Sequence, residues 1–315
     1  MRCVLCKSRS FEAVSEVDAK TSERLVVSIC THCGLVQQTP IPPTDALKIY
    51  YSHHYRADYK KTYSPTAQHV YRAAKTAMHR IDFLHQHSVT TGTLIDVGAG
   101  GGEFVYLSGR RGFDSQGIEP NIGYAEYAKN EYGCAIETGG IENMRGRHDV
   151  ITMFHVLEHM ASPLMAMEKL YWSLNENGIL FIEVPWIETR DASPHNIYFK
   201  AHIVYFSIDT LLACASCYFD VLTIDTTSNL KVLFKAKHSP TALRLPSRSS
   251  VDAARKRIKE RGWIEYLFAG KGLFKPIRKL SRSIEERKVN GLSGKKIADD
   301  ILINWRSTTA NEHRR

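Results

Sequence analysis

The sequence of 315 residues contains no run of 18 or more apolar residues, so it predicts no membrane-spanning helix. The first residues also lack the apolar segment of a secretion signal, which favours a cytoplasmic location. The seven cysteines are an odd number, and without that signal they argue against a disulfide framework. Disorder throughout is excluded, because 43% of the residues are hydrophobic and both signs of charge are well represented.

The net charge of +9 is unevenly distributed. Residues 241–315 contain 19 Lys and Arg against 8 Asp and Glu, whereas residues 1–240 contain 23 against 25. A nucleic-acid enzyme usually carries its basic surface around the active site, so this distribution argues against a nucleic-acid substrate. Apolar residues are interleaved with the basic ones, which favours amphipathic helices that pack on the protein or on a second subunit. Peripheral contact with an anionic membrane surface is the alternative.

Two C-x2-C pairs lie near the N-terminus: Cys3 and Cys6, then Cys30 and Cys33. Two intervening residues let both thiolates of a tight turn face one ion, and two such pairs complete the four-cysteine set of a structural zinc site. Between them, Phe11–Ile29 alternates in places as the short strands of a ribbon would. Because so small a lobe has little core, we expect bound metal to supply its folding energy. Four free thiols on a surface arm are the alternative.

Residues 93–184 alternate between short apolar strands and helices. The predicted strands are Thr93–Val97, Ser115–Glu119, Val150–Phe154 and Ile179–Val184. An earlier helix is expected to be capped by Ser64, with one apolar face made of Val70, Ala74, Ala77, Met78, Ile81 and Leu84. This order predicts an α/β protein with a doubly wound, Rossmann-like parallel sheet that helices cover on both faces.

The first of these strands runs into a glycine-rich loop. The dinucleotide fingerprint G-x-G-x-x-G fails there, because its third glycine falls on another residue in either register. The register that fits is Asp96-x-Gly98-x-Gly100-x-Gly102. It resembles motif I of class I methyltransferases, which bind S-adenosylmethionine (SAM). The resemblance implies that the glycines let the backbone approach the methionine part of SAM.

Two more residues are candidates for contact with SAM. Glu119 ends the second strand, 23 residues after Asp96, and its carboxylate has four lone-pair sites with which to accept both ribose hydroxyls. Phe154 ends the third strand. A loop bordered by acids, without a Walker-type lysine, suits the sulfonium cation of SAM better than the phosphates of ATP. The alternative for Asp96 and Glu119 is a pair of solvated loop acids.

With the four cysteines and motif I, the segment Thr31–Arg56 resembles zinc-ribbon SAM methyltransferases of bacterial sugar and glycan pathways, including the deoxysugar C-methyltransferases. The likeness covers about residues 1–240. We divide the chain into a zinc ribbon (1–40), an aromatic linker and helical lid (41–90), a SAM-binding domain (91–240) and a basic helical tail (241–315). In the linker, the resemblance implies that tyrosines close over cofactor and sugar, and the candidates are Tyr51, His53, His54 and Tyr55. An aromatic linker packed on the domain is the alternative.

His155, Glu158 and His159 follow the third strand, at the end where open α/β sheets bind ligands. The segment resembles the V-L-E-H segment of the methyltransferase superfamily. Its alternatives are a cap for the helix near Ser162 and a divalent ion held by the three side chains. The metalloprotease pattern H-x-x-E-H is disfavoured, because here it follows a strand instead of lying within a helix.

His202 ends a segment that occupies the place of Tyr-His-Glu-His in the sugar C-methyltransferases, where the resemblance implies that the last His is the base and the Glu supports it. Phe199, Lys200 and Ala201 replace the other three residues. Removing a proton from carbon needs a well-supported base, whereas a hydroxyl needs only a histidine of near-neutral pKa. We therefore expect O-methylation with His202 as base, and His155 or His159 orienting the acceptor. A packed structural histidine is the alternative.

The sequence thus predicts an enzyme, a cytoplasmic SAM-dependent methyltransferase with a structural zinc ion. Its expected acceptor is a hydroxyl of a sugar nucleotide or glycan, free or lipid-linked. Three alternatives stay open. They are C-methylation of a deoxysugar nucleotide, methylation of RNA or protein with ribbon and tail as recognition modules, and a SAM-binding adaptor without catalysis.

Overall fold

The computed structural model describes residues 1–43, 46–47, 64–270 and 272–312. They belong to two compact units: the first comprises Met1–Lys48 and Met153–Pro276, and the second comprises Ile49–Thr152 and Ile277–Arg315. The predicted aromatic cluster of Tyr51, His53, His54 and Tyr55 lies outside the described residues. In the described part of the chain, none of the helices combines the length and apolarity needed to cross a membrane. The four-part division of the sequence stays a prediction.

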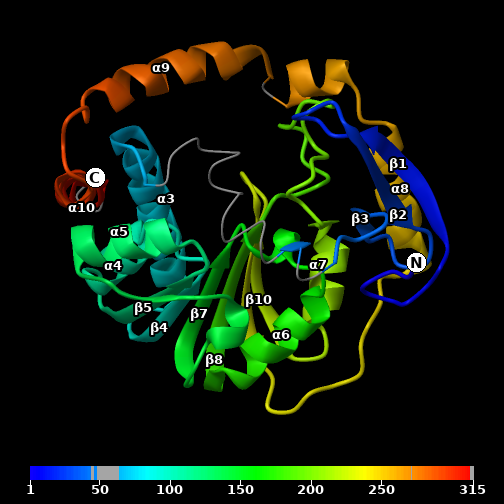
Figure 1. The fold of residues 1–315 in the computed structure, drawn as a ribbon, viewed down its shortest axis with the longest axis horizontal. Helices are drawn as coiled ribbons and strands as arrows, with labels where there is room; N and C mark the ends of the chain where they lie inside the picture. The colour runs from blue at the N-terminus through cyan, green and yellow to red at the C-terminus, as the bar shows by residue number, and fades with distance from the viewer. Residues whose placement is uncertain (44–45, 48–63, 271, 313–315) are drawn as a thin grey trace. The chain divides into compact units, whose positions relative to one another are not determined.

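A seven-stranded mixed sheet confirms the predicted α/β, Rossmann-like class, with the order β10-β11-β8-β7-β4-β5-β6 (Figure 1). The strands are β4 (Gly92–Val97), β5 (Phe113–Glu119), β6 (Ala135–Thr138), β7 (His148–Phe154), β8 (Leu174–Val184), β10 (Phe219–Asp225) and β11 (Leu230–Ala236). β4, β5 and β6 pair in parallel, but β11 is antiparallel to both β8 and β10. The prediction of a wholly parallel sheet is wrong at this edge, because β10 and β11 are joined by a short hairpin connection and not by a crossover helix.

Among the described residues, the second unit includes the helices α3 (Ala67–Gln86), α4 (Glu103–Gly109), α5 (Ile122–Tyr132) and α10 (Gly294–Glu312). The six apolar residues predicted for one face of α3 are all buried. The helix begins two residues later than expected, since Thr66 and not Ser64 caps it by accepting a hydrogen bond from the His69 N–H. The C-terminal helix α10 packs on α3, where the Trp305 indole donates to Asp82.

The ribbon of the first unit is a separate antiparallel sheet, with the order β1-β2-β3-β9. Its strands are β1 (Phe11–Val17), β2 (Arg24–Cys30), β3 (Val36–Gln38) and β9 (Val204–Tyr205). The strands predicted between the cysteine pairs are confirmed. The fourth strand, which comes from far along the chain, was not predicted. Helices α6 (Pro163–Trp172) and α7 (Ile208–Ala215) complete the described core of this unit.

The basic segment, residues 241–315, contains four elements before α10 in its described part. They are α8 (Arg248–Lys259), a π-helical turn (Glu265–Ala269), a 3₁₀ turn (Gly272–Phe274) and α9 (Lys275–Arg287). α8 packs on the ribbon, as Figure 1 shows beside the blue strands. Val251 and Ala254 are buried, and Arg255 and Lys259 both pair with Glu12 of β1. Part of the basic segment is therefore structural.

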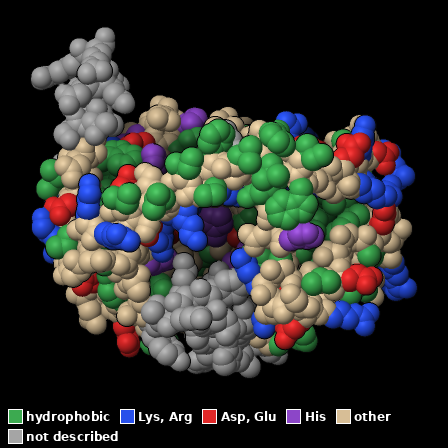
Figure 2. Space-filling model, turned by 90° about the horizontal axis from the view of Figure 1, so that it is seen from above, with side chains coloured by type: hydrophobic (Ala, Val, Ile, Leu, Met, Phe, Trp, Pro, Cys, Tyr) green, Lys and Arg blue, Asp and Glu red, His purple; other side chains and the backbone are tan. Residues whose placement is uncertain are grey.

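Between α8 and α10, large apolar side chains are exposed. Ile264, Phe268, Phe274, Ile277 and Leu280 each expose 60% or more of their surface. Figure 2 shows hydrophobic side chains beside Lys and Arg on one face of the molecule. Contact of this segment with an anionic membrane stays a prediction.

Gln38 of β3 joins the ribbon to the segment that carries His202. The side chain is 3% exposed, and its amide nitrogen donates to the carbonyl oxygens of Lys200 (2.8 Å) and His202 (2.9 Å). Its backbone N–H donates to Ile203. Asp18, after β1, accepts a hydrogen bond from the Lys200 N–H at 2.7 Å. The ribbon therefore fixes the backbone on both sides of His202.

We predict that Gln38→Leu destabilises the protein, because it leaves two carbonyl oxygens without a donor. The free energy of unfolding, measured by urea denaturation, should fall by about 1–3 kcal/mol. Gln86→Leu makes the same chemical change at the exposed end of α3 and should have an effect within about 0.5 kcal/mol. Equal stability of the two variants would contradict the role assigned to Gln38.

Candidate active site

The glycine loop follows β4, the strand with β5 on one side and β7 on the other. In open α/β sheets, ligands bind beyond the carboxyl ends of the strands where the strand order reverses. Gly98, Gly100 and Gly102 have φ values of 79°, 57° and 85°, a region that side chains disfavour. A Cβ on Gly102 would lie 2.6 Å from the Cβ of Ala128 in α5, so the glycine also permits close packing of α4 on α5.

Glu119 holds the glycine loop from the end of β5. One carboxylate oxygen accepts the Gly100 N–H at 2.8 Å, and the other accepts the Asn121 N–H at 3.0 Å. The side chain is only 3% exposed, which rules out a solvated loop acid. The bonds of Glu119 to the ribose hydroxyls stay a prediction.

Asp96 is also buried, with 3% of its surface exposed. Its carboxylate accepts a hydrogen bond from the Thr152 hydroxyl of β7 at 2.7 Å. Burial raises the pKa of Asp96 to about 7, although the Thr152 hydroxyl acts in the opposite direction. Asp96 therefore links β4 to β7 beneath the loop, and the interpretation as a solvated acid is wrong here too.

Phe154, the third candidate for cofactor contact, is 8% exposed at the end of β7. Its ring packs edge-to-face on Phe181 of β8, with centroids 5.0 Å apart. The Phe154 ring is therefore part of the core of the first unit. Its contact with the cofactor stays a prediction.

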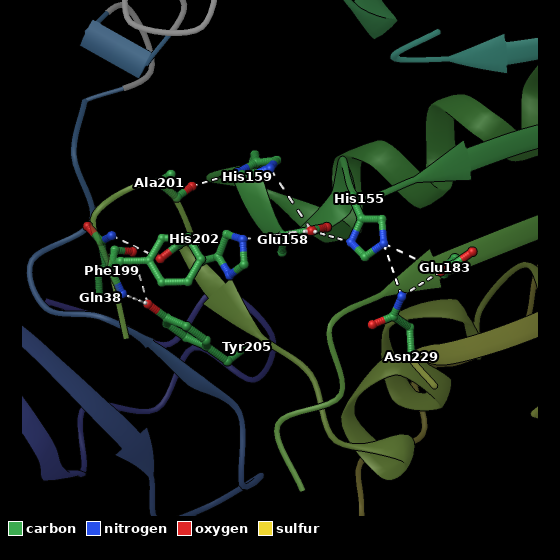
Figure 3. Close-up of polar contacts among 10 residues, drawn as sticks. All are labelled: Gln38, His155, Glu158, His159, Glu183, Phe199, Ala201, His202, Tyr205 and Asn229. Atoms are coloured by element: carbon green, nitrogen blue, oxygen red, sulfur yellow. Dashed lines mark hydrogen bonds and ion pairs between the residues drawn. The ribbon is translucent and has the colours of Figure 1, made fainter. Parts of the chain in front are cut away.

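In the first unit, His155 lies between two buried carboxylates (Figure 3). Its Nδ1 is 3.4 Å from Glu158 and its Nε2 is 3.4 Å from Glu183, to which Asn229 donates a hydrogen bond. Its φ of 56° is unusual for a residue with a side chain. Burial lowers the pKa of His155, but the two carboxylates outweigh it and raise the pKa to about 9. His155 is therefore a cation at neutral pH.

Glu158 is the centre of this cluster and is 1% exposed. Burial alone would raise its pKa, but His155 and His159 hold the pKa at about 2. Oε1 of Glu158, the oxygen that lies near His155, is also 4.0 Å from Nε2 of His159 and 4.0 Å from Nε2 of His202. His159 Nδ1 donates to the Ala201 carbonyl at 2.6 Å, since a carbonyl can only accept, and this fixes the ring.

His202 is nearly buried, with 12% of its side chain exposed. Its ring lies against Phe199, with centroids 4.0 Å apart. Burial and the neighbouring His159 lower the pKa of His202 to about 3. The expected near-neutral pKa is therefore wrong, because the sequence did not reveal the burial. His202 is neutral throughout the physiological pH range and has a free lone pair with which to accept a proton.

The structure also corrects two other interpretations of this cluster, the helix cap and the ion site. A capping role for His155 and Glu158 is wrong, because they face each other and Ser162 caps α6 without a side-chain bond. The predicted ion site also changes its members: Glu158, His159 and His202, and not His155, place their ligand atoms within 4.8 Å of one another. Two imidazoles and a carboxylate suit a divalent transition metal.

A cavity of about 290 Å³ opens beside His202 within the first unit. We call it the His202 cavity; its lining includes Trp186, Phe199, His202, Tyr205, Asn229 and Arg261. Its volume is near the lower end for small-molecule sites, roughly 300–1,000 Å³. Aromatic faces combined with amide and hydroxyl groups suit a polar ring such as a sugar.

The four N-terminal cysteines come together as predicted. The Sγ atoms of Cys3 and Cys33 are 3.5 Å apart, as are those of Cys6 and Cys30, and all four lie within 4.8 Å of one another. Tetrahedral zinc about 2.3 Å from each sulfur separates the sulfurs by roughly 3.8 Å. The donor set therefore fits zinc in number, chemistry and spacing.

Three residues that the sequence analysis missed support the cluster: Gln38, Glu183 and Asn229. Glu183 had a signal, since it is the one charged residue in the apolar run Ile179–Val184. Its 2% exposure shows that it is a buried acid and therefore needs a cation. Gln38 and Asn229 carried no such signal, because each acts on partners far away in the sequence.

Residues 68–216 match the family model described as a methyltransferase domain. No curated protein matches the chain. Among solved structures, magnesium protoporphyrin IX methyltransferase from Synechocystis PCC 6803 is 11% identical, with 62% of this chain and 99% of that chain covered and a TM-score of 0.48. Ribosomal protein L11 methylase from Lactobacillus delbrueckii subsp. bulgaricus is 17% identical, with coverage of 51% and 77% and a TM-score of 0.40. The domain match supports SAM as the cofactor of the glycine loop.

We predict that two substitutions in the loop weaken SAM binding. Glu119→Ala removes the acceptor for Gly100 and for the ribose, and should lower the affinity by roughly 1–3 kcal/mol. Gly100→Val places a branched side chain at a φ of 57° and should block the approach of SAM. Isothermal titration calorimetry measures both. Glu137→Ala, on the exposed surface of β6, is the control, and wild-type affinity in both loop variants would refute the assigned register.

Proposed function

We propose that this chain is a SAM-dependent methyltransferase that methylates a hydroxyl of a sugar nucleotide or glycan. The observation that carries the proposal is a neutral histidine, His202, which lines a cavity and is backed by a buried carboxylate. Along the chain, the same strand leads to both sites, since Thr152 of β7 is bonded to Asp96 and the strand ends at Phe154, directly before His155.

In the proposed reaction, the acceptor oxygen attacks the methyl carbon of SAM. The new C–O bond forms as the C–S bond breaks, and S-adenosylhomocysteine leaves as a neutral thioether. The hydroxyl proton becomes strongly acidic as the oxygen gains its third bond, so even a weak base such as His202 can accept it. Catalysis otherwise rests on positioning, because SAM supplies the reactive group.

In the sugar C-methyltransferases that the sequence resembles, a Glu that supports the base stands where this chain has Ala201. In our proposal, Glu158 is the supporting acid instead. Its carboxylate lies 4.0 Å from His202 Nε2, so it stabilises the imidazolium that forms when Nδ1 accepts the proton. The supporting acid thus comes from the turn after β7 and not from the neighbouring residue. This support also keeps C-methylation open as the second candidate, and the position of the methyl group on a labelled product distinguishes the two.

We predict that His202→Ala keeps the fold and the SAM affinity but loses turnover. A general base contributes about 10²–10⁴-fold, so the rate on a nucleotide-sugar acceptor should fall by at least about a hundredfold. Because the pKa of His202 is lowered to about 3, its neutral form persists down to that pH. The wild-type rate should therefore show no loss between pH 7 and 5 that arises from this residue. Transfer from radiolabelled SAM gives the rate and its pH profile.

His238→Ala removes an exposed histidine and is the matched control, with unchanged turnover expected. Near-normal turnover of His202→Ala would end the proposed role. A divalent ion on Glu158, His159 and His202 would occupy the same imidazole, so the base role also requires that added Mn²⁺ or Mg²⁺ does not raise the rate. SAM binding without transfer to any acceptor would favour the adaptor without catalysis. Transfer to RNA or protein would favour a methyltransferase that uses the ribbon and the tail for recognition.

We further propose that the four cysteines hold one structural zinc ion. Zinc would close the ribbon, and the ribbon in turn holds the backbone of His202 through β3, β9 and Gln38. Loss of the metal should therefore reduce acceptor turnover, although the cofactor loop belongs to the other unit.

Metal analysis of protein purified without chelators should find about one zinc per chain. Cys30→Ser should lose that zinc and the acceptor turnover while SAM affinity is largely retained, because Glu119 and Gly100 belong to the other unit. Cys217→Ser alters the other C-x2-C sequence and should keep its zinc. Protein without zinc, or full turnover of Cys30→Ser, would contradict this proposal.

A further inference from the structure

Arg261 brings a buried positive charge to the His202 cavity. The residue directly follows the C-cap of α8, and it lines the cavity together with His202. Its Nε and Nη2 atoms are buried and have no hydrogen-bond partner in the part of the chain that the structure describes. A guanidinium has five N–H donors, and leaving them unpaired away from water is costly.

The carboxylates near Arg261 already have other partners. Glu265 pairs with Arg190 (3.1 Å) and with Arg257 (2.8 Å), and Glu188 accepts a hydrogen bond from the Trp186 indole. These two acids therefore face three arginines. Burial lowers the pKa of Arg261, with Arg257 acting in the same direction, against the opposing effects of Tyr198, Glu265 and Glu188. Among these five side chains the arginines outnumber the glutamates by one, and Asp191 in the cavity wall brings the acids to three.

The position of Arg261 is built into the fold. α8 is fixed to the ribbon by the ion pairs of Arg255 and Lys259 with Glu12, and its Val251 is buried. The helix therefore delivers its C-terminal end to the wall of the cavity. Asp191 is the acid that lines the same cavity, and it can accept hydrogen bonds from sugar hydroxyls.

We propose that Arg261 binds an oxyanion of the methyl acceptor, a phosphate or a carboxylate, while the acceptor hydroxyl lies at His202. A guanidinium fork matches both groups in bidentate fashion. The proposal rests on the proposed function, because the acceptor is the molecule that His202 deprotonates. It narrows the substrate to anionic sugars, among which a sugar phosphate or nucleotide sugar is one source and a uronic acid is the other.

The test measures binding without SAM and without turnover, so that it is independent of methyl transfer. Glucose 1-phosphate, glucuronic acid and glucose are titrated into the full-length protein by calorimetry. We expect one of the two anionic probes to bind at least tenfold more tightly than glucose, and the better probe identifies phosphate or carboxylate. Equal binding of all three probes, or no binding of any, would overturn the proposal.

Arg261→Gln should abolish the preference for the anionic probe, and Arg261→Lys should keep part of it, because the charge remains but the fork is lost. Arg190→Gln, an exposed arginine of the same charge group, should keep the full preference. The thermal stability of Arg261→Gln should be equal to or above that of the wild type, since Nε and Nη2 of Arg261 have no hydrogen-bond partner among the described residues. A preference that survives in Arg261→Gln, or a marked loss of stability without a change in preference, means that Arg261 is structural. Methyl transfer that fails while the anion preference holds would count against His202 alone.

Discussion

A carboxylate buried as deeply as Glu158 must either lose its charge or be surrounded by cations, and this chain does the latter. This requirement for a compensating charge explains how the charged side chains around Glu158 are arranged in the first unit. His155 adopts a left-handed backbone conformation and lies between Glu158 and Glu183, so that one cation compensates two acids. The second neighbour of Glu158, His202, stays neutral, because burial and His159 lower its pKa more than Glu158 raises it. One protonated and one unprotonated histidine therefore lie beside the same carboxylate.

The ribbon and the basic segment both serve this cluster. β9 and Gln38 tie the ribbon to the backbone beside His202. α8 lies on the ribbon, and Arg261, which follows its C-cap, lines the cavity. Of these two segments, the basic one contributes Arg261 to the cavity wall, whereas the ribbon holds the backbone beside His202. Zinc, which would close the ribbon, acts in this scheme on the acceptor and not on SAM. Metal loss and cofactor loss are for this reason separable in experiment.

The second unit has a simpler task. Its loop glycines have positive φ values, Glu119 holds the Gly100 N–H, and Asp96 is bonded to Thr152 below the loop. Each of these interactions preorganises the backbone before a ligand arrives, which reduces the ordering cost of binding. The two acids that the sequence predicted to contact SAM, Asp96 and Glu119, first of all hold the backbone of the loop and its strands. Contact of Glu119 with the ribose stays a prediction.

Local patterns in the sequence determined the elements: the apolar face of α3, the alternation of strands and helices, the glycine register and the two cysteine pairs. These features depend on spacing along the chain, which periodicity and turn chemistry reveal directly. The tertiary structure alone decided the charge states and the membership of the cluster. His202 replaced His155 in the possible ion site, and its pKa fell because it is buried beside His159. Arg261, Gln38 and Asn229 joined the site from distant segments, and the antiparallel strands β11 and β10 completed one end of the sheet. Burial and long-range contact set pKa values and partners, and neither is encoded in the residues adjacent along the chain.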